Sequence, residues 1–341
     1  MAVNQNPQVL HHKALKALSP SLRYDGTIPF PEWQKSARER LAALLGMHKL
    51  TPAAQDDFTL LSTEEFDTFT DYALRFQSEE GYYVACHLWV PKGIEGKLPL
   101  VICLQGHSTG YHISMGRPLY PGDEKSIGDG DRDFAVQFLQ EGYCALCIEQ
   151  RNFGECANTL GKTRGCIVPS LSALLYGRTT IGERVFDIQR AIDILPKHFP
   201  VIDTDAIACM GNSGGGTATI YAAAMEERIS LAMPSCALCT YGDSIGAMHH
   251  CPCNFIPNIA LDFDMGDLCG LIAPRPLIVV SGALDDIFPH NGVAESVEVA
   301  SNYYRAANAP DACTWLEGEG GHRFYADLSW PVFRKMLLKS S

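Results

Sequence analysis

The sequence has little positive charge for its length. Its 341 residues include 27 Lys and Arg against 39 Asp and Glu, a formal net charge of −12 at pH 7. A surface that binds nucleic acid needs a basic patch to neutralise phosphates. The sequence also contains no basic run that would be drawn to an anionic membrane surface. We therefore expect neither nucleic acid nor a membrane as a partner.

Long hydrophobic runs are missing as well. No apolar stretch approaches the roughly 18 residues that a membrane-spanning helix needs, although 46% of the residues are hydrophobic. Residues 1–7 are polar and lack the apolar core of a secretory signal peptide. There is no internal repeat and no low-complexity tract. These absences predict a globular protein of the cytoplasm.

Cysteine is plentiful, with 13 residues, and many of them lie inside apolar strand-like runs. In a reducing compartment such cysteines behave as small hydrophobic residues. A zinc site is the alternative, and its members would be Cys236, Cys239, His249, His250, Cys251 and Cys253. Its second pair, C-x-C, lacks the usual gap of two residues. Packing, with His249 or His250 lining a pocket, is the favoured interpretation, and we expect no metal and no cofactor.

A G-x-S-x-G pentapeptide at residues 211–215 is the most informative motif. The preceding run, 206–210, is apolar and predicts a buried strand, and the Ala-rich run 217–227 predicts a helix. A strand, a sharp glycine-rich turn and a helix form the nucleophile elbow of an α/β-hydrolase. A phosphate-binding loop would need G-K-[ST] or G-x-G-x-x-G spacing, which is absent. The pattern predicts Ser213 as a nucleophile.

A serine nucleophile needs a base, and the base needs an orienting acid. In this fold they follow in the order serine, acid, histidine. The apolar run 276–281 leads into a loop with two adjacent acids, Asp285 and Asp286. The spacing G-x-x-D-x-[IV]-x-P favours Asp285, with Asp286 as the alternative. A later glycine-rich loop carries His322, which suits a mobile general base.

The oxyanion hole of such an enzyme uses two backbone N–H groups. One belongs to the residue after the nucleophile, which is Gly214 here. The other comes from the loop after an early strand, predicted at 98–104 and followed by Gln105, Gly106 and His107. Gly106 allows the backbone to turn an amide toward the substrate. We expect the N–H of His107 to be the second donor.

With these motifs the chain resembles the acetyl xylan esterase and dienelactone hydrolase-like branch of the α/β-hydrolases, which includes cephalosporin-C-deacetylase-type esterases. The resemblance covers most of the chain. It is carried by residues 72–74, 88–93, 105–107, 149–155, the elbow, 249–254, 271–276 and 321–322. It implies an esterase of short acyl groups, acetyl first, on a carbohydrate or small molecule. The serine argues against dienelactone hydrolase activity, which uses a cysteine.

Two departures from that family's pattern fall near the expected site. The family usually has His-Gly-His where this chain has Gln105-Gly106-His107, and often Asp-x-Arg-Gly where this chain has residues 149–152. We expect Gln105, Arg151 and His250 near the substrate pocket. An anionic substrate is a further option, although arginines are more often structural or solvated. The arginines concerned would be Arg117, Arg151, Arg164 and Arg178.

Alternating strand and helix patterns from residue 98 onward predict a doubly wound, mostly parallel sheet with helices on both faces. A helix with its apolar face on Trp33, Ala37 and Leu41 is expected before it, and an antiparallel strand pair at 66–90. We expect an N-terminal helical appendage at 1–60 and an α/β-hydrolase catalytic domain at 61–341. Its loop insertions would lie near 111–130, 156–180 and 240–268, where long loops commonly act as lids.

The predicted function is that of a serine carboxylesterase acting on short-chain, acetyl-type esters of a carbohydrate or small molecule through an acyl-enzyme. An amidase or peptidase of the same fold would use the same triad. A non-catalytic hydrolase-fold binding protein would usually have a broken triad. A homo-oligomer is possible on this sequence.

Overall fold

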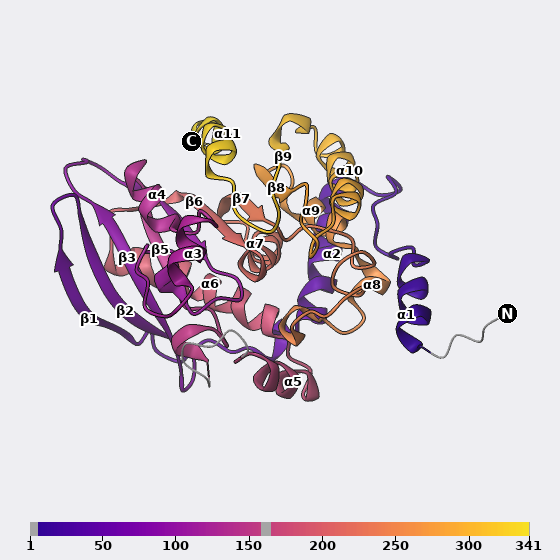
Figure 1. Ribbon diagram of the computed structural model, residues 1–341, viewed down its shortest axis with the longest axis horizontal. Helices are drawn as coiled ribbons and strands as arrows, with labels where there is room; N and C mark the ends of the chain where they lie inside the picture. Colours follow the sequence, from indigo (N-terminus) through magenta and orange to yellow (C-terminus); the bar gives the residue numbers. More distant parts are fainter. Residues whose placement is uncertain (1–5, 158–164, 341) are drawn as a thin grey trace.

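The computed structural model describes residues 6–157 and 165–340. A single nine-stranded sheet runs through it in the order β1-β2-β3-β5-β4-β6-β7-β8-β9 (Figure 1). The strands are β1 Phe58–Glu65, β2 Phe69–Glu79, β3 Tyr82–Pro91, β4 Leu98–Leu104, β5 Cys144–Ile148, β6 Ile202–Asn212, β7 Ile229–Ser235, β8 Leu277–Gly282 and β9 Cys313–Gly318. β1, β2 and β3 pair antiparallel, as do β3 and β5, and the rest of the sheet is parallel.

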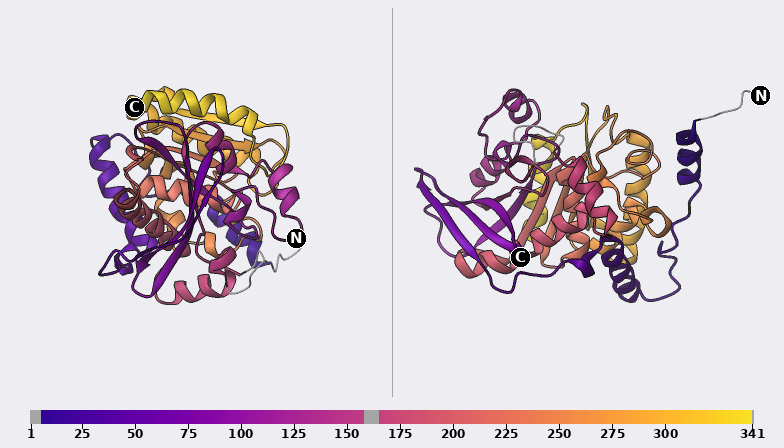
Figure 2. Two further views of the ribbon diagram at one scale, coloured as in Figure 1. Left: turned by 90° about the vertical axis from the view of Figure 1, so that its left-hand side faces the viewer. Right: turned by 90° about the horizontal axis from the view of Figure 1, so that it is seen from below.

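Helices cover both faces of the sheet (Figures 1 and 2). They are α1 Pro7–Lys16, α2 Phe30–Leu45, α3 Asp123–Gly128, α4 Phe134–Gln140, α5 Ile167–Leu175, α6 Thr180–His198, α7 Gly214–Met225, α8 Ile259–Asp262, α9 Met265–Ile272, α10 His290–Ala306 and α11 Ala326–Ser340. One buried cluster joins the sheet to α2, α6, α7, α9 and α10, and a second joins its other face to α4 and α11. None of the helices within the described ranges is long and apolar enough to span a bilayer.

The predicted α/β-hydrolase fold, with its doubly wound and mostly parallel sheet, is confirmed. The expected strand pair at 66–90 is β2 and β3, whose turn contains Gly81 at φ 77°. The first expected helix is α2, which buries Trp33, Ala37 and Leu41 in the cluster shared with α6 and α7. Each of the three segments expected as long loops contains helical turns, namely α3, α5 and the pair α8 and α9.

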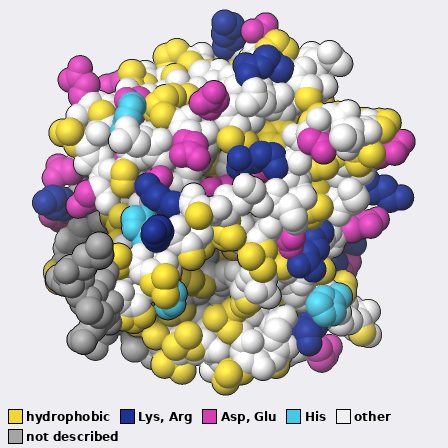
Figure 3. All heavy atoms as spheres, turned by 90° about the vertical axis from the view of Figure 1, so that its right-hand side faces the viewer, with side chains coloured by type: hydrophobic (Ala, Val, Ile, Leu, Met, Phe, Trp, Pro, Cys, Tyr) yellow, Lys and Arg dark blue, Asp and Glu magenta, His cyan; other side chains and the backbone are white. Residues whose placement is uncertain are grey.

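α1 lies on the outside of the molecule and buries none of its residues. Gln8 donates a hydrogen bond to the Ala247 carbonyl, and Lys16 forms an ion pair with Asp243. Figure 3 views this end of the molecule, where exposed hydrophobic side chains gather toward the lower edge. α1 therefore borders the segment after β7, which also contributes to the site described next.

Candidate active site

The G-x-S-x-G motif forms the tight connection between β6 and α7. Ser213 has φ 58° and ψ −124°, a left-handed conformation that costs a non-glycine residue energy. Gly106 packs directly on this turn, since a Cβ there would lie 2.6 Å from the Asn212 carbonyl oxygen and 2.8 Å from the Ser213 Cβ. The sequence thus places small residues where two loops must touch, and the turn presents the Ser213 side chain to a cavity.

Asp285 and His322 are brought together from two different loops. Asp285 follows β8 and His322 follows β9, and these neighbouring parallel strands end at the same edge of the sheet. The Asp285 Oδ2 lies 2.8 Å from the His322 Nδ1. The Asp285 Oδ1 accepts hydrogen bonds from the backbone amides of Ile287 and Phe288 at 2.9 and 3.1 Å. Asp286, the alternative acid, points to solvent as an exposed side chain.

The environment of Asp285 favours its charged form. Burial alone would raise the pKa of this carboxyl, which is only 4% exposed. The His322 ring and the two backbone amides outweigh burial and hold the pKa below its ordinary value. Asp285 is therefore a carboxylate at neutral pH, and it can fix the tautomer of His322 by accepting a hydrogen bond from the Nδ1–H group.

Ser213 and His322 open into the same cavity, which has a volume of about 350 Å³. Its lining combines polar, imidazole and hydrophobic groups: His107, Arg132, Cys166, Ile167, Ser213, Gly214, His249, His250, Cys251, Asn254, Ile287, Phe288 and His322. A larger cavity, of about 650 Å³, lies elsewhere and includes Ser230, Arg275 and Pro276 at the amino ends of β7 and β8. The chemistry in a parallel sheet belongs at the carboxyl ends, so the smaller cavity is the candidate site.

The two residues expected to form an oxyanion hole flank Ser213 in this cavity. Gly214 is the first residue of α7, so its N–H has no acceptor within the helix. His107 follows β4 and packs beside Gly214, where a Cβ would lie 3.3 Å from the His107 Nδ1. The loop after β4 and the start of α7 thus meet at the nucleophile, which is the arrangement that two convergent amide donors require.

Two further histidines of the cavity are neutral at physiological pH. Burial, helped by the Arg184 guanidinium and the imidazoles of His250 and His322, lowers the pKa of His107 to about 3. Burial also lowers the pKa of His250 to about 4. The His250 Nε2 lies 3.2 Å from the Ser244 hydroxyl, and its ring packs edge-on against Phe288. The neutral rings of His107 and His250 can form hydrogen bonds with a bound molecule, but they carry no charge.

Of the three residues expected near the pocket, the structure places only His250 in it. Gln105 is buried behind the cavity wall, where its Nε2 donates to the Ser114 hydroxyl and the Arg132 carbonyl, both at 2.8 Å. Arg151 points away from the cavity and stacks over the Tyr82 ring. Neither residue therefore lines the cavity, because each side chain is held by buried polar partners of its own.

The arginines suggested for an anionic substrate have structural partners instead. Arg151 pairs with Asp187 at 2.7 Å, Arg117 pairs with Asp71 at 2.9 Å, and Arg178 pairs with Glu79. Arg164 lies outside the described residues. The cavity wall contains a different arginine, Arg132. Burial lowers the pKa of Arg132, and its Nε has no hydrogen-bond partner in the described structure.

Arg132, Ile287 and Phe288 were missed in the sequence, although they line the site. Ile287 and Phe288 lie two and three residues after Asp285, so the G-x-x-D-x-[IV]-x-P spacing contained the signal. Phe288 stacks parallel to the His322 ring, with centroids 5.9 Å apart. Arg132 is a single arginine in a polar loop before α4, and no local pattern distinguishes it from a solvated residue.

The cysteines that lie together in the structure are not the set considered as zinc ligands in the sequence. Cys236 lies beside Asp285 and His322, and the Cys239 thiol donates to the Pro289 carbonyl. Cys251 and Cys253 instead meet His107 and Cys166, and Cys166 and Cys251 are paired as a disulfide. The sequence-based set therefore does not assemble among the described residues. His249 and His250 line the cavity, as the packing interpretation expected.

Part of this chain matches a known protein family. Residues 53–246, more than half of the sequence, match the family described as "Acetyl xylan esterase (AXE1)". The chain is 25% identical over 235 residues to YtaP of Bacillus subtilis (strain 168), which is classed as a hydrolase by its name alone. That match covers 68% of this chain and 75% of YtaP.

Solved structures share the fold across nearly the whole chain. BF1801 from Bacteroides fragilis NCTC 9343, which carries the name of an acetyl xylan esterase, superposes with a TM-score of 0.81 at 17% identity, over 98% of this chain and 95% of that one. The methylesterase BT1017 gives 0.71 at 22% identity, over 96% and 70%. A glucuronoyl esterase from Solibacter usitatus gives 0.68 at 16% identity, over 94% and 97%.

Proposed function

The chain belongs to the acetyl xylan esterase (AXE1) family and hydrolyses ester bonds, and we propose that it is a serine carboxylesterase specific for short acyl groups, acetyl first. The observation that carries the proposal is the convergence of Ser213 and the Asp285–His322 pair on one cavity. The strained turn exposes the hydroxyl, and the carboxylate orients the imidazole.

In the proposed mechanism, His322 takes the proton of the Ser213 hydroxyl as the oxygen attacks the ester carbonyl. Asp285 accepts the Nδ1 hydrogen bond of His322 and stabilises the imidazolium that forms. His322 then protonates the leaving alcohol, and the acyl group remains on Ser213. A water molecule deprotonated by His322 attacks the acyl-enzyme, and His322 returns the proton to the Ser213 oxygen as the carboxylic acid leaves.

The negative oxygen of each tetrahedral intermediate would be bound by the N–H groups of Gly214 and His107. Both residues line the cavity beside Ser213. Amides that are already fixed in place need no reorganisation when charge develops, and one such donor typically contributes about 3–4 kcal/mol. Gly106 supports this role, because any side chain there would push the His107 loop away from the turn.

The cavity supports a small acyl group on a polar alcohol. At about 350 Å³ it is at the lower end for small-molecule sites. Its wall offers hydrogen-bonding groups from His249, Asn254 and Arg132 to a hydroxylated or anionic alcohol portion. The names of the similar structures, an acetyl xylan esterase and a glucuronoyl esterase, agree with a carbohydrate ester.

Hydrolysis of p-nitrophenyl esters of increasing acyl length tests this proposal. We expect activity to peak at acetyl and kcat to fall at least about 10³-fold in Ser213→Ala, because the nucleophile is removed. Ser230→Ala, which removes a hydroxyl at the amino end of β7, is the control and should retain activity. A loss of less than tenfold in Ser213→Ala would refute the assignment, and hydrolysis of amides in preference to esters would indicate an amidase.

A further inference from the structure

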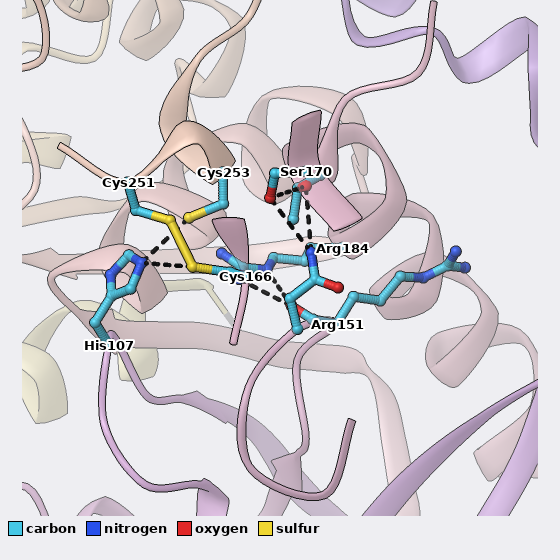
Figure 4. Close-up of a disulfide and its surroundings, with 9 residues drawn as sticks. His107, Arg151, Cys166, Ser170, Arg184, Cys251 and Cys253 are labelled. Atoms are coloured by element: carbon cyan, nitrogen blue, oxygen red, sulfur yellow. Dashed lines mark hydrogen bonds between the residues drawn. A yellow bond between two sulfur atoms is a disulfide. The ribbon is translucent and has the colours of Figure 1, made fainter. Parts of the chain in front are cut away.

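A cluster of soft metal ligands forms one wall of the candidate site. His107 follows β4, Cys166 immediately precedes α5, and Cys251 and Cys253 lie at the short helical turn η4, Pro252–Asn254. Their ligand atoms all lie within 4.8 Å of one another. Figure 4 shows the three cysteine sulfurs and the His107 ring converging from these separate loops. Three cysteines and one histidine are an established ligand set for structural zinc.

The distances from the His107 ring to two of the sulfurs are close to those between ligands of one tetrahedral ion, whereas the bonded sulfurs of Cys166 and Cys251 must first separate. The His107 Nε2 lies 3.5 Å from the Cys166 Sγ and 3.3 Å from the Cys253 Sγ. Zinc bonds of about 2.3 Å to sulfur and about 2.0–2.1 Å to nitrogen place two tetrahedral donors roughly 3.5–3.8 Å apart. The Cα atoms of Cys166 and Cys251 are 7.3 Å apart, above the roughly 4.4–6.8 Å usual for a disulfide. Cys166 and Cys251 could keep this wider Cα separation if both sulfurs bound one ion.

A buried arginine beside the cluster gives an independent indication of negative charge. Arg184 is 1% exposed, and its guanidinium lies 4.0 Å from the centre of the Phe153 ring, where it interacts electrostatically with the Cys253 thiol and with the buried carboxyl of Glu149. Its Nε and Nη2 donate to the Arg151 carbonyl, while its Nη1 has no hydrogen-bond partner among the residues that the structure describes. None of the ion pairs found between described residues includes Arg184. A buried cation of this kind requires a nearby anion.

We propose that the reduced chain binds one zinc ion through the thiolates of Cys166, Cys251 and Cys253 and the Nε2 of His107. Zinc displaces three thiol protons on binding, and the centre of one Zn²⁺ and three thiolates has a net charge of −1. That charge would neutralise Arg184. The Cys166–Cys251 disulfide is first opened by thiol–disulfide exchange with a dithiol reductant, which is itself oxidised to a disulfide.

The four protein ligands fill the coordination sphere, so the ion has no open position for substrate or water. Its role is to position loops. Coordination joins the His107 loop to the segments containing Cys166 and Cys251, and all three residues line the cavity. It also fixes the orientation of the His107 ring, which packs at 4.8 Å against Phe153. The backbone N–H of His107, a proposed oxyanion donor, would be held in place as a result.

Metal analysis tests the site without reference to activity. The full chain is purified under reducing conditions without chelator, supplied with ZnCl₂, desalted, and analysed for zinc by mass spectrometry. We expect close to one zinc per chain in the wild type, less than a tenth of that in Cys253→Ser, and the wild-type amount in Cys313→Ser. Cys313 is a partly buried cysteine at the start of β9, outside the cluster.

Cobalt substitution keeps the test decisive if Cys253→Ser fails to fold. The wild-type protein loaded with Co²⁺ should show the intense visible bands of tetrahedral cobalt bound to thiolates. No bound metal in the reduced, folded wild type, or a Cys166–Cys251 disulfide that persists under dithiothreitol, would overturn the proposal.

Removal of the ion by a chelator should lower kcat on acetyl esters at least about tenfold, and kcat should recover when zinc is added. Because metal content is measured independently of activity, the zinc result would stand even if the protein did not hydrolyse acetyl esters.

Discussion

At the residue scale, the structure distinguishes two neighbouring acids that the sequence could only rank. The sequence favoured Asp285 from its spacing, and both acids occupy the same loop. In the structure Asp285 is buried against His322 and Asp286 is exposed. Consecutive residues of a loop point in different directions, so one acid excludes the other from the contact. Residues such as Arg132 and Cys166 had no comparable local signal, because their neighbours in space are distant in sequence.

Replacing each acid by its amide tests this distinction. Asp285→Asn should lower kcat on an acetyl ester by roughly 10⁴-fold, because an amide favours the wrong tautomer of the histidine. Asp286→Asn should change kcat by less than about threefold, since an exposed side chain outside the cavity is altered. The two variants are matched in chemistry and position. Steady-state kinetics showing the reverse order would transfer the orienting role to Asp286.

At the element scale, the strand, turn and helix around Ser213 were predicted well because their signals are local. The expected strand 206–210 corresponds to β6, which is longer at both ends, and the expected helix 217–227 corresponds to α7, which begins and ends a few residues earlier. α10 was not predicted, and the segments expected as loops contain α3, α5, α8 and α9. These short helices are stabilised by packing against the body more than by an internal pattern, so the sequence gives little sign of them.

Gly106 lies where the loop after β4 touches the turn between β6 and α7. Gly106→Ala should lower kcat by roughly 10²-fold, because the added Cβ would lie 2.6 Å from the Asn212 carbonyl oxygen and must displace the turn or the His107 loop. Stability should fall by about 1–3 kcal/mol, as for other overpacked sites. Kinetics and urea unfolding measure the two effects.

Gly128→Ala, at the end of α3, is the matched control, because a Cβ there meets no atom within 4 Å. It should leave both kcat and stability close to the wild type. If Gly106→Ala retained full activity, the close approach of the β4 loop to the elbow would not matter for the reaction.

At the scale of the whole molecule, the hydrophobic pattern predicts the layers but not the charges enclosed between them. The alternation of strands and helices specified the doubly wound sheet, and α2 packs into the same buried cluster as α6 and α7. The interior also contains Arg151, Arg184, Asp187 and Glu149, all nearly inaccessible to solvent. Sequence reasoning placed Arg151 near the substrate because it lies in a motif, residues 149–152, where this chain departs from the family's pattern. Only the three-dimensional structure shows which acidic residues pair with Arg151.

Glu149 makes the stability of the whole molecule depend on pH. Burial raises its pKa to about 8, and the amides of Tyr111 and Glu155, which donate to it, offset this only in part. The folded state therefore keeps a proton that the unfolded chain releases near its ordinary pKa of about 4.3. Between these values the folded state binds more protons, so the free energy of unfolding falls as pH rises, by up to ~1.4 kcal/mol per pH unit.

Glu149→Gln removes this ionisation while retaining an oxygen that can accept the two amide hydrogen bonds. Urea unfolding at pH 5, 6, 7 and 8 should show the variant gaining stability relative to the wild type at each step, with the difference levelling off above about pH 8. Glu80→Gln, an exposed change in the β2–β3 turn, should run parallel to the wild type. Parallel curves for Glu149→Gln as well would mean that Glu149 is already ionised in the folded protein, and that Arg184 compensates its charge more fully than burial penalises it.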